Sequence, residues 1–206
     1  MRKPKTSSKT KVFSEITNKT TVDNRLTQAA LLLNYAFDYG VDFKNRVIEI
    51  TGEIDEIQFD RLDTAMTEME SESKKTITIK INSPGGSTYQ ALAMVGRIKE
   101  SKCHIVTKGY GHVMSAATLI LACGDKRYMS RFGFFMHHEC SYEIGGRHSE
   151  IKADVMQVEN EEKLWCQWMG EFTAESQSFW KKHGVGKNAY FTAEELLSLG
   201  VIDELF

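Results

Sequence analysis

The sequence predicts a layered α/β fold in a single domain. Short β-branched or alternating runs, such as residues 46–50 and 76–81, are separated by stretches with apolar side chains at helical spacing. This rhythm of strand and helix repeats along the chain, as is typical of helices packed on a sheet. A length of 206 residues suits one domain, and the chain has only two prolines and no low-complexity linker.

The first half of the chain supplies five elements in order. Residues 24–38 are strongly apolar and predict a helix that is partly buried or used in assembly. Residues 46–50 are β-branched and alternate, which predicts a strand, and residues 55–72 have the apolar spacing of a helix. Residues 76–81 alternate cleanly and predict a second strand. Residues 87–100 predict a helix that a serine caps.

The second half continues the alternation. Residues 103–108 predict a third strand, residues 115–123 a helix of small and aliphatic side chains, and residues 126–138 short strands. Residues 148–183 predict one long helix of about 35 residues, more than this domain needs to cover its sheet, so we expect the excess to pack on another subunit. Residues 192–199 begin with a capping box and predict a last helix.

Composition excludes several function classes. The net charge is −2, so bulk charge does not favour nucleic acid or a membrane surface as a partner. No apolar run reaches the length of a membrane span. The cysteines show neither CxxC pairs nor metal-like spacing with histidine, so we expect no metal and buried free thiols. Free thiols are typical of a reducing compartment, which predicts a cytoplasmic protein. These cysteines are Cys103, Cys123, Cys140 and Cys166.

The N-terminal segment differs from the rest in composition. Residues 1–22 are rich in lysine, serine and threonine, and they lack the apolar core of a secretory signal. We expect a flexible basic tail or a propeptide there, with a transit peptide as the alternative. Residues 23–206 then form the single folded domain.

The residues that carry chemistry surround Ser115. This serine lies in a run of small residues between a strand-like and a helix-like segment, where its oxygen can be exposed at a helix start. The sequence INSPGG precedes it at residues 81–86, and Met136, His137 and His138 follow it. A serine, a loop of backbone donors and a histidine are the parts of an acyl-transfer site. A plain helix cap is the alternative role for Ser115.

Taken together, these motifs resemble the ClpP family of serine peptidases. The resemblance rests on INSPGG, a serine at a helix start, and a Met-x-His strand, and it also covers residues 192–195 and 199–203. It extends over about residues 44–206. It implies a crotonase-like, ClpP-type α/β subunit of repeated β-β-α layers with a long protruding handle helix.

The resemblance also implies roles for individual residues. Ser115 is the nucleophile, and His138 is the base because it matches the histidine of the family's strand; His137 then points to the opposite face. Backbone amides of Gly86 and Ala116 form the oxyanion hole, where glycine permits a close approach to the developing charge.

The third member of the triad departs from the family pattern. The family has an aspartate shortly before the helix that starts at Thr192, and this chain has Asn188 there. An asparagine oxygen can orient the imidazole but supplies no charge to stabilise the imidazolium. Three alternatives stay open: Asn188 orients His138 in a slower enzyme, Glu139 or Asp203 substitutes for it, or the subunit is weakly active or inactive.

A glycine-containing segment before the long helix matches the family's substrate strand. The resemblance implies that it pairs with peptide by strand addition and takes part in contacts between rings. A flexible loop is the alternative. With Gly85, the substrate-binding residues are Glu143, Ile144, Gly145 and Gly146.

The function implied is a serine endopeptidase subunit of a self-compartmentalising ring protease, without metal or cofactor. Heptameric rings stacked as a tetradecamer, unfolded or peptide substrates, and an AAA+ unfoldase (Clp ATPase) are the implied partners. Residues 1–43 show no convincing copy of the segment that guides unfoldase binding, so a phage-type capsid-maturation protease that works without an unfoldase is an alternative. A catalytically weak structural subunit and a crotonase-fold acyl-CoA enzyme are further alternatives.

Overall fold

The computed structural model describes residues 27, 30, 31, 33, 35, 36 and 38–206. The tail expected at residues 1–22 lies outside the described residues. The described residues between 27 and 39 are helical, within and just beyond the helix expected at 24–38.

One mixed sheet organises the described part of the chain. Its path runs β1-β2-β3-β4-β5-β8, while β6 pairs with β4 and β7 pairs with β6. The neighbours from β2 to β8 along the path are parallel, as expected when helices connect successive strands. The strands are β1 (Val41–Asp42), β2 (Val47–Ile54), β3 (Ile77–Gly86), β4 (Ile105–Met114), β5 (Lys126–Met129), β6 (Phe134–His137), β7 (Ala189–Phe191) and β8 (Glu204–Leu205).

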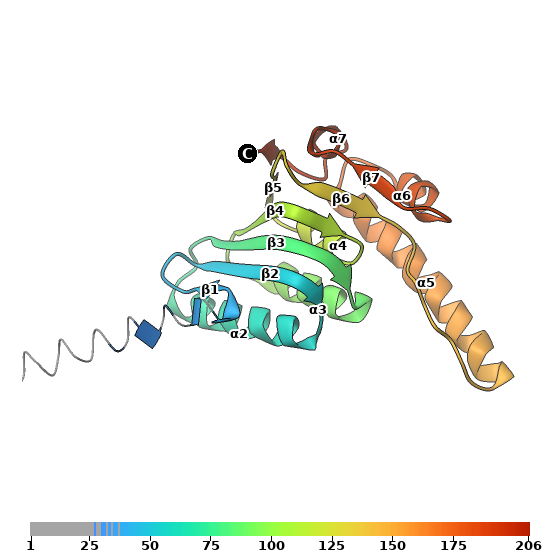
Figure 1. Cartoon of the computed structure of the whole chain (residues 1–206), viewed down its shortest axis with the longest axis horizontal. Coiled ribbons are helices and arrows are strands. Elements are labelled where there is room, and N and C mark those ends of the chain that lie inside the picture. Colours follow the sequence, from blue (N-terminus) through green and yellow to red (C-terminus); the bar gives the residue numbers. More distant parts are fainter. Residues whose placement is uncertain (1–26, 28–29, 32, 34, 37) are drawn as a thin grey trace, which may run out of the picture.

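Helices α2, α3 and α4 lie together against the sheet and bury its core (Figure 1). Isoleucines at alternate positions of β3, including Ile77, Ile79 and Ile81, are fully buried, and helix residues such as Met66 and Leu121 belong to the same core. The layered α/β class is therefore confirmed. The helices are α2 (Glu56–Glu72), α3 (Thr88–Glu100), α4 (Ala117–Ala122), α5 (His148–Phe172), α6 (Gln177–Gly184) and α7 (Ala193–Ser198).

The prediction of one helix over residues 148–183 is wrong, because the structure has two helices there, α5 and α6. The chain breaks after α5, where the Thr173 hydroxyl donates to the Met169 carbonyl at 2.6 Å. Ser176 then starts α6 by accepting a side-chain hydrogen bond from the Phe179 amide at 3.2 Å. The serine cap was the sequence signal for this break.

Helix α5 has two halves with different surroundings. Its C-terminal half buries Trp165, Cys166 and Met169 in the core of this chain, so this half packs within the subunit and not on another one. Its N-terminal half extends away from the sheet (Figure 1) and leaves Val155 and Met156 exposed by 42% and 62%. Only this half presents unpacked apolar side chains.

Two strands continue further than their alternation indicated. Strand β3 runs to Gly86 and includes the whole INSPGG motif, and β4 runs to Met114 through residues expected in a turn. The pairing of β3 with β4 shifts in register between Ile81 and Ser83 of β3, as at a β-bulge. The short strands β1, β7 and β8 were not separated from loops in the sequence, because two or three residues carry no periodicity.

Asp203 is bound to Arg127 near the C-terminal end of the sheet. The guanidinium donates to Asp203 Oδ1 at 2.7 Å, and the Arg127 amide donates to Asp203 Oδ2 at 2.7 Å. The same guanidinium donates to the carbonyls of Gly200 and Phe172. Burial alone would raise the pKa of Asp203, but its hydrogen bonds and charge attraction with Arg127 outweigh burial and lower that pKa.

We expect Asp203→Asn to lower the free energy of unfolding by about 2 kcal/mol at neutral pH, because hydrogen bonds to a charged group are lost. Since the folded-state pKa is depressed, this stability is present above the unfolded pKa and is lost as pH falls through the folded pKa. Urea unfolding should therefore show a difference between wild type and variant at pH 7 that shrinks below about pH 4. A constant difference across this range would contradict a charge-based contribution.

Candidate active site

Ser115 lies on a sharp turn between a strand and a helix. It follows β4 directly and precedes α4, and its φ of 51° is unusual for a residue with a side chain. Such a backbone costs about 1–3 kcal/mol and is concentrated at functional sites. The Ser115 amide donates to the Met136 carbonyl at 2.8 Å, so the turn is fixed to β6. Helix α4 has no side-chain cap, and the Ser115 hydroxyl is free for another partner.

That partner is His138. Its Nε2 lies 2.7 Å from Ser115 Oγ, within hydrogen-bonding distance. The contact follows from the sheet: β6 pairs parallel to β4 with Met114 opposite Met136, which brings His138 beside the turn two residues later. Burial lowers the pKa of His138, and the Glu139 carboxylate offsets this in part. The imidazole is therefore neutral at pH 7 and able to accept a proton.

His137 faces the core instead. It is 2% exposed, and its Nε2 lies 3.1 Å from the Trp180 carbonyl. Burial lowers the pKa of His137 to about 4. The two adjacent histidines thus lie on opposite sides of the chain, and only His138 contacts Ser115.

The glycines of the INSPGG motif pack against this turn. A side chain on Gly85 would place its Cβ 2.6 Å from Ser115 Cβ, and one on Gly86 would come within 2.4 Å of the Ile54 carbonyl oxygen. Both have positive φ values, 103° and 147°, which favour glycine. The buried Ser83 hydroxyl accepts from the Gly85 amide at 3.1 Å and shapes the loop.

One backbone amide next to the nucleophile is available. The Ser87 amide donates to the Ile54 carbonyl at 2.8 Å, just beyond the pairing of Ile54 with Gly86. In the described part of the chain, the Ala116 amide donates no hydrogen bond within the protein. Unengaged N–H groups beside a nucleophile are suited to an oxyanion.

Asn188 lies next to His138 in the sheet register. Strands β6 and β7 are antiparallel with His137 opposite Ala189, so Asn188 stands one position beyond the ladder on the side of His138. Asn188 is exposed and makes no hydrogen bond with His138. Among the described residues, Nδ1 of His138 has no hydrogen-bond partner.

The other two candidates are engaged elsewhere. Glu139 accepts from the Gly186 amide at 3.0 Å, although its charge reaches His138. Asp203 is bound to Arg127 and makes no hydrogen bond with the imidazole. Asp203 therefore has a structural role beside Arg127.

Among the residues that the structure describes, none pairs as a strand with the glycine-containing segment. Residues 140–147 form neither helix nor strand, and Glu143, Gly145 and Gly146 are exposed, as is Ile144 at 37%. The segment runs along α5 (Figure 1). Its backbone is open to pairing with another extended chain.

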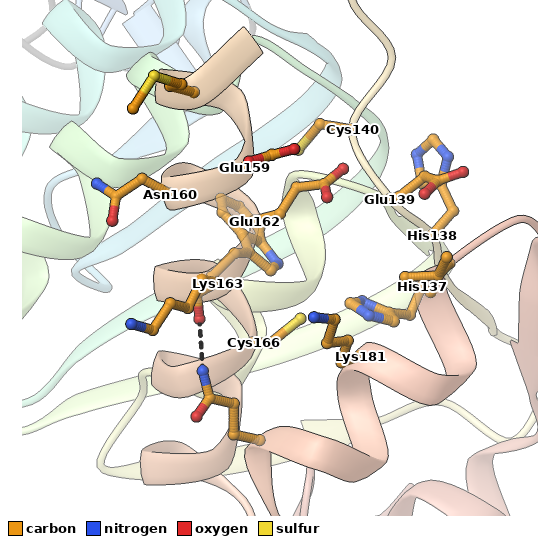
Figure 2. Close-up of a pocket in the computed structure, with 15 residues that line it drawn as sticks. His137, His138, Glu139, Cys140, Glu159, Asn160, Glu162, Lys163, Cys166 and Lys181 are labelled. Atoms are coloured by element: carbon orange, nitrogen blue, oxygen red, sulfur yellow. Dashed lines mark hydrogen bonds between the residues drawn. The ribbon is translucent and has the colours of Figure 1, made fainter.

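A cavity of about 500 Å³ adjoins His138 between β6, α5 and α6. Figure 2 shows Glu162 and Cys166 from α5 and Lys181 from α6 turned toward it, with His138 and Glu139 at its rim. Burial raises the pKa of Glu162, and repulsion from Glu139 adds to this. No local sequence pattern indicates this cavity, because its walls come from three separate segments, at residues 137–140, 156–166 and 177–185.

The residues that the structure describes hold no group of three or more His, Cys, Asp or Glu side chains that could bind a metal ion. Within the same residues, no helix is long and apolar enough to cross a membrane.

The known proteins to which this chain is similar include several Clp protease subunits. The family model described as "Clp protease" matches residues 34–206. "ATP-dependent Clp protease proteolytic subunit 3" of Rhodococcus jostii is 30% identical over 188 residues, which cover 87% of this chain and 91% of that protein. "ATP-dependent Clp protease proteolytic subunit 1" of Corynebacterium jeikeium is 26% identical over 165 residues, covering 79% and 87%. "ATP-dependent Clp protease proteolytic subunit 2" of Corynebacterium diphtheriae is 25% identical over 185 residues, covering 88% and 92%.

Proposed function

This chain belongs to the Clp protease family, as its motifs predicted, and we propose that it is a serine endopeptidase subunit that cleaves peptide bonds through an acyl-enzyme on Ser115. The observation that carries the proposal is the 2.7 Å contact between His138 Nε2 and Ser115 Oγ on a strained strand-to-helix turn.

The reaction follows from this contact. The Ser115 oxygen attacks the peptide carbonyl while its proton moves to His138 Nε2, which leaves an imidazolium and a tetrahedral oxyanion. The amides of Gly86 and Ala116 donate to that oxyanion. His138 then gives its proton to the leaving amine, and the acyl group stays on Ser115. Water, deprotonated by His138, attacks the ester and releases the second product.

The substrate is an extended peptide. We assign its backbone to the segment at residues 143–146 and to Gly85, where pairing reads few side chains and permits broad specificity. The cavity beside His138 is large enough for one substrate side chain. Its mixed walls, with Trp165 and Met156 beside Glu162 and Lys181, suit a long side chain with an apolar stem.

Assembly completes the proposal. The relatives are named as proteolytic subunits of ATP-dependent proteases, which supports assembly with other subunits and an AAA+ unfoldase as partner. We propose that the subunits form heptameric rings stacked as a tetradecamer, as the resemblance implies. The N-terminal half of α5, with Ile151, Val155 and Met156 exposed, is the surface we assign to contacts between rings as the family's handle helix. A cytoplasmic location follows from the same family assignment.

A weakly active or inactive structural subunit is the second candidate. The observation that favours it is the unpartnered Nδ1 of His138 beside an exposed Asn188 within the described residues. Without an acceptor there, the imidazole is not held in the productive tautomer.

Active-site labelling separates the two candidates. We expect a fluorophosphonate to modify wild-type protein at Ser115, because attack on phosphorus requires the same activated oxygen and the same oxyanion donors. Peptide mapping of the adduct and its loss in Ser115→Ala are the readouts. Folded wild-type protein that stays unmodified while a known serine hydrolase in the same tube is labelled would leave the structural subunit as the function.

A further inference from the structure

The Glu161 carboxylate on α5 accepts hydrogen bonds from three side chains. Its Oε1 accepts from the Tyr89 hydroxyl at 3.1 Å and from the Gln157 side-chain amide at 2.7 Å. Its Oε2 accepts from the Tyr142 hydroxyl at 3.0 Å. One carboxylate of α5 thus holds two tyrosines that are 53 positions apart in the sequence, as their numbers in the chain show.

We call residues 81–86 the glycine loop, and the space between this loop and residues 141–146 the peptide-binding gap. One of the two tyrosines lies on each side of this gap. Tyr89 is in the first turn of α3, three residues after Gly86 of the glycine loop. Tyr142 precedes Glu143 and Ile144 in the glycine-containing segment. Glu161 therefore fixes both sides of the gap to the same turn of α5.

Residues 141–146, on the second side of the gap, make few other hydrogen bonds. In the part of the chain that the structure describes, the Tyr142 hydroxyl makes the only hydrogen bond from residues 141–146 to a helix. A side chain at Gly145 would contact nothing within 4 Å, so nothing packs against the segment at that position. The Tyr142–Glu161 hydrogen bond therefore joins the segment to α5.

Both tyrosines remain donors at the pH at which the protein works. The hydrogen bond to Glu161 is the first cause that raises the pKa of Tyr89. Burial and then hydrogen bonds with Cys140 and Glu161 raise the pKa of Tyr142. Both hydroxyls therefore stay protonated and donate to Glu161.

We infer that Glu161 is a positioning residue for peptide substrates: through Tyr142 and Tyr89 it holds residues 141–146 at a set spacing from the glycine loop. This inference rests on the proposed peptidase function. Without Glu161, the segment must be ordered when peptide binds, and the ordering cost weakens peptide binding. The contact between Ser115 and His138 does not involve Glu161, so the chemical step is preserved.

The test measures peptide binding and catalysis separately. In a Ser115→Ala background, we expect Glu161→Ala and Tyr142→Phe each to weaken the affinity for a fluorescent ten-residue unstructured peptide about 10-fold, as the loss of a charge-assisted hydrogen bond predicts. With Ser115 intact, KM should rise by a similar factor while kcat changes less than about 3-fold. The rate of fluorophosphonate labelling should also stay near the wild-type value, because this small probe does not span the gap.

Two further variants sharpen the result. Glu161→Gln keeps one acceptor oxygen and should restore part of the affinity. Glu171→Ala removes an exposed carboxylate of the same helix that accepts a hydrogen bond from Gln167, and this variant should bind peptide as wild type does. Unchanged peptide affinity in both Glu161→Ala and Tyr142→Phe would overturn the inference, as would an equal loss in kcat and labelling rate. If peptide affinity depends on Glu161 but wild-type protein neither labels nor hydrolyses, Glu161 positions a bound peptide and the peptidase function is wrong.

Discussion

Replacement of Ser115 by alanine is expected to lower kcat for peptide hydrolysis by about 10⁶-fold, the loss seen when a nucleophile that acts as a unit with its base is removed. His138→Ala should cost nearly as much. The double variant should lose little more than either single variant, because each change alone already disables proton transfer coupled to attack. The residual rate above that of water then reports the oxyanion amides of Gly86 and Ala116.

Steady-state hydrolysis of a peptide substrate by purified oligomer measures this cycle. Ser71→Ala is a suitable control, because that serine is on the exposed end of α2 and donates only to the Glu68 carbonyl. Thermal unfolding should show that all variants are folded. If the fold-loss of kcat in the double variant equalled the product of the two single losses, Ser115 and His138 would act independently, contrary to their contact at 2.7 Å.

The central pair of the site could be predicted because local signals and sheet geometry agree. Glycine at positions 85 and 86 marked a backbone that approaches another group closely, and Ser115 marked a sharp turn. The match to the family's Met-x-His strand selected His138, and the alternation of a strand then placed His137 on the opposite face, since neighbouring side chains point to opposite faces. The observed burial of His137 against Trp180 follows this rule.

Other features depend on contacts that no local pattern contains. The Glu161 network joins tyrosines from α3 and from the segment before α5, and their meeting is set by how α5 packs. Strand β4 continues to Met114 through residues 109–114 because β3 and β6 supply hydrogen-bonding partners there, although glycine disfavours strands. Asp203 was a plausible triad member in the sequence, but its position beside Arg127 is a matter of tertiary structure.

Replacement of Asn188 by aspartate is the change expected to raise activity. Strand register sets residue 188 beside His138, where a carboxylate would hold the imidazole and stabilise the imidazolium that forms during attack. The corresponding charge can be worth up to about 10⁴-fold in kcat in a buried triad. Since residue 188 is exposed and its charge is screened, we expect a gain of about 10²-fold or less. Asn188→Ala should lower kcat if the amide orients His138.

The pH dependence of kcat/KM gives this prediction a second readout. In wild type, burial lowers the pKa of His138, so the ascending limb of the profile should lie below the usual histidine range. A carboxylate at position 188 favours the imidazolium, which raises the pKa of His138 and moves the limb to higher pH. Glu139→Gln removes a nearby charge and should move the limb the other way. If Asn188→Asp changes neither the rate nor the limb while Glu139→Gln lowers the rate, Glu139 is the group that supports His138, and residue 188 has no part in activating Ser115.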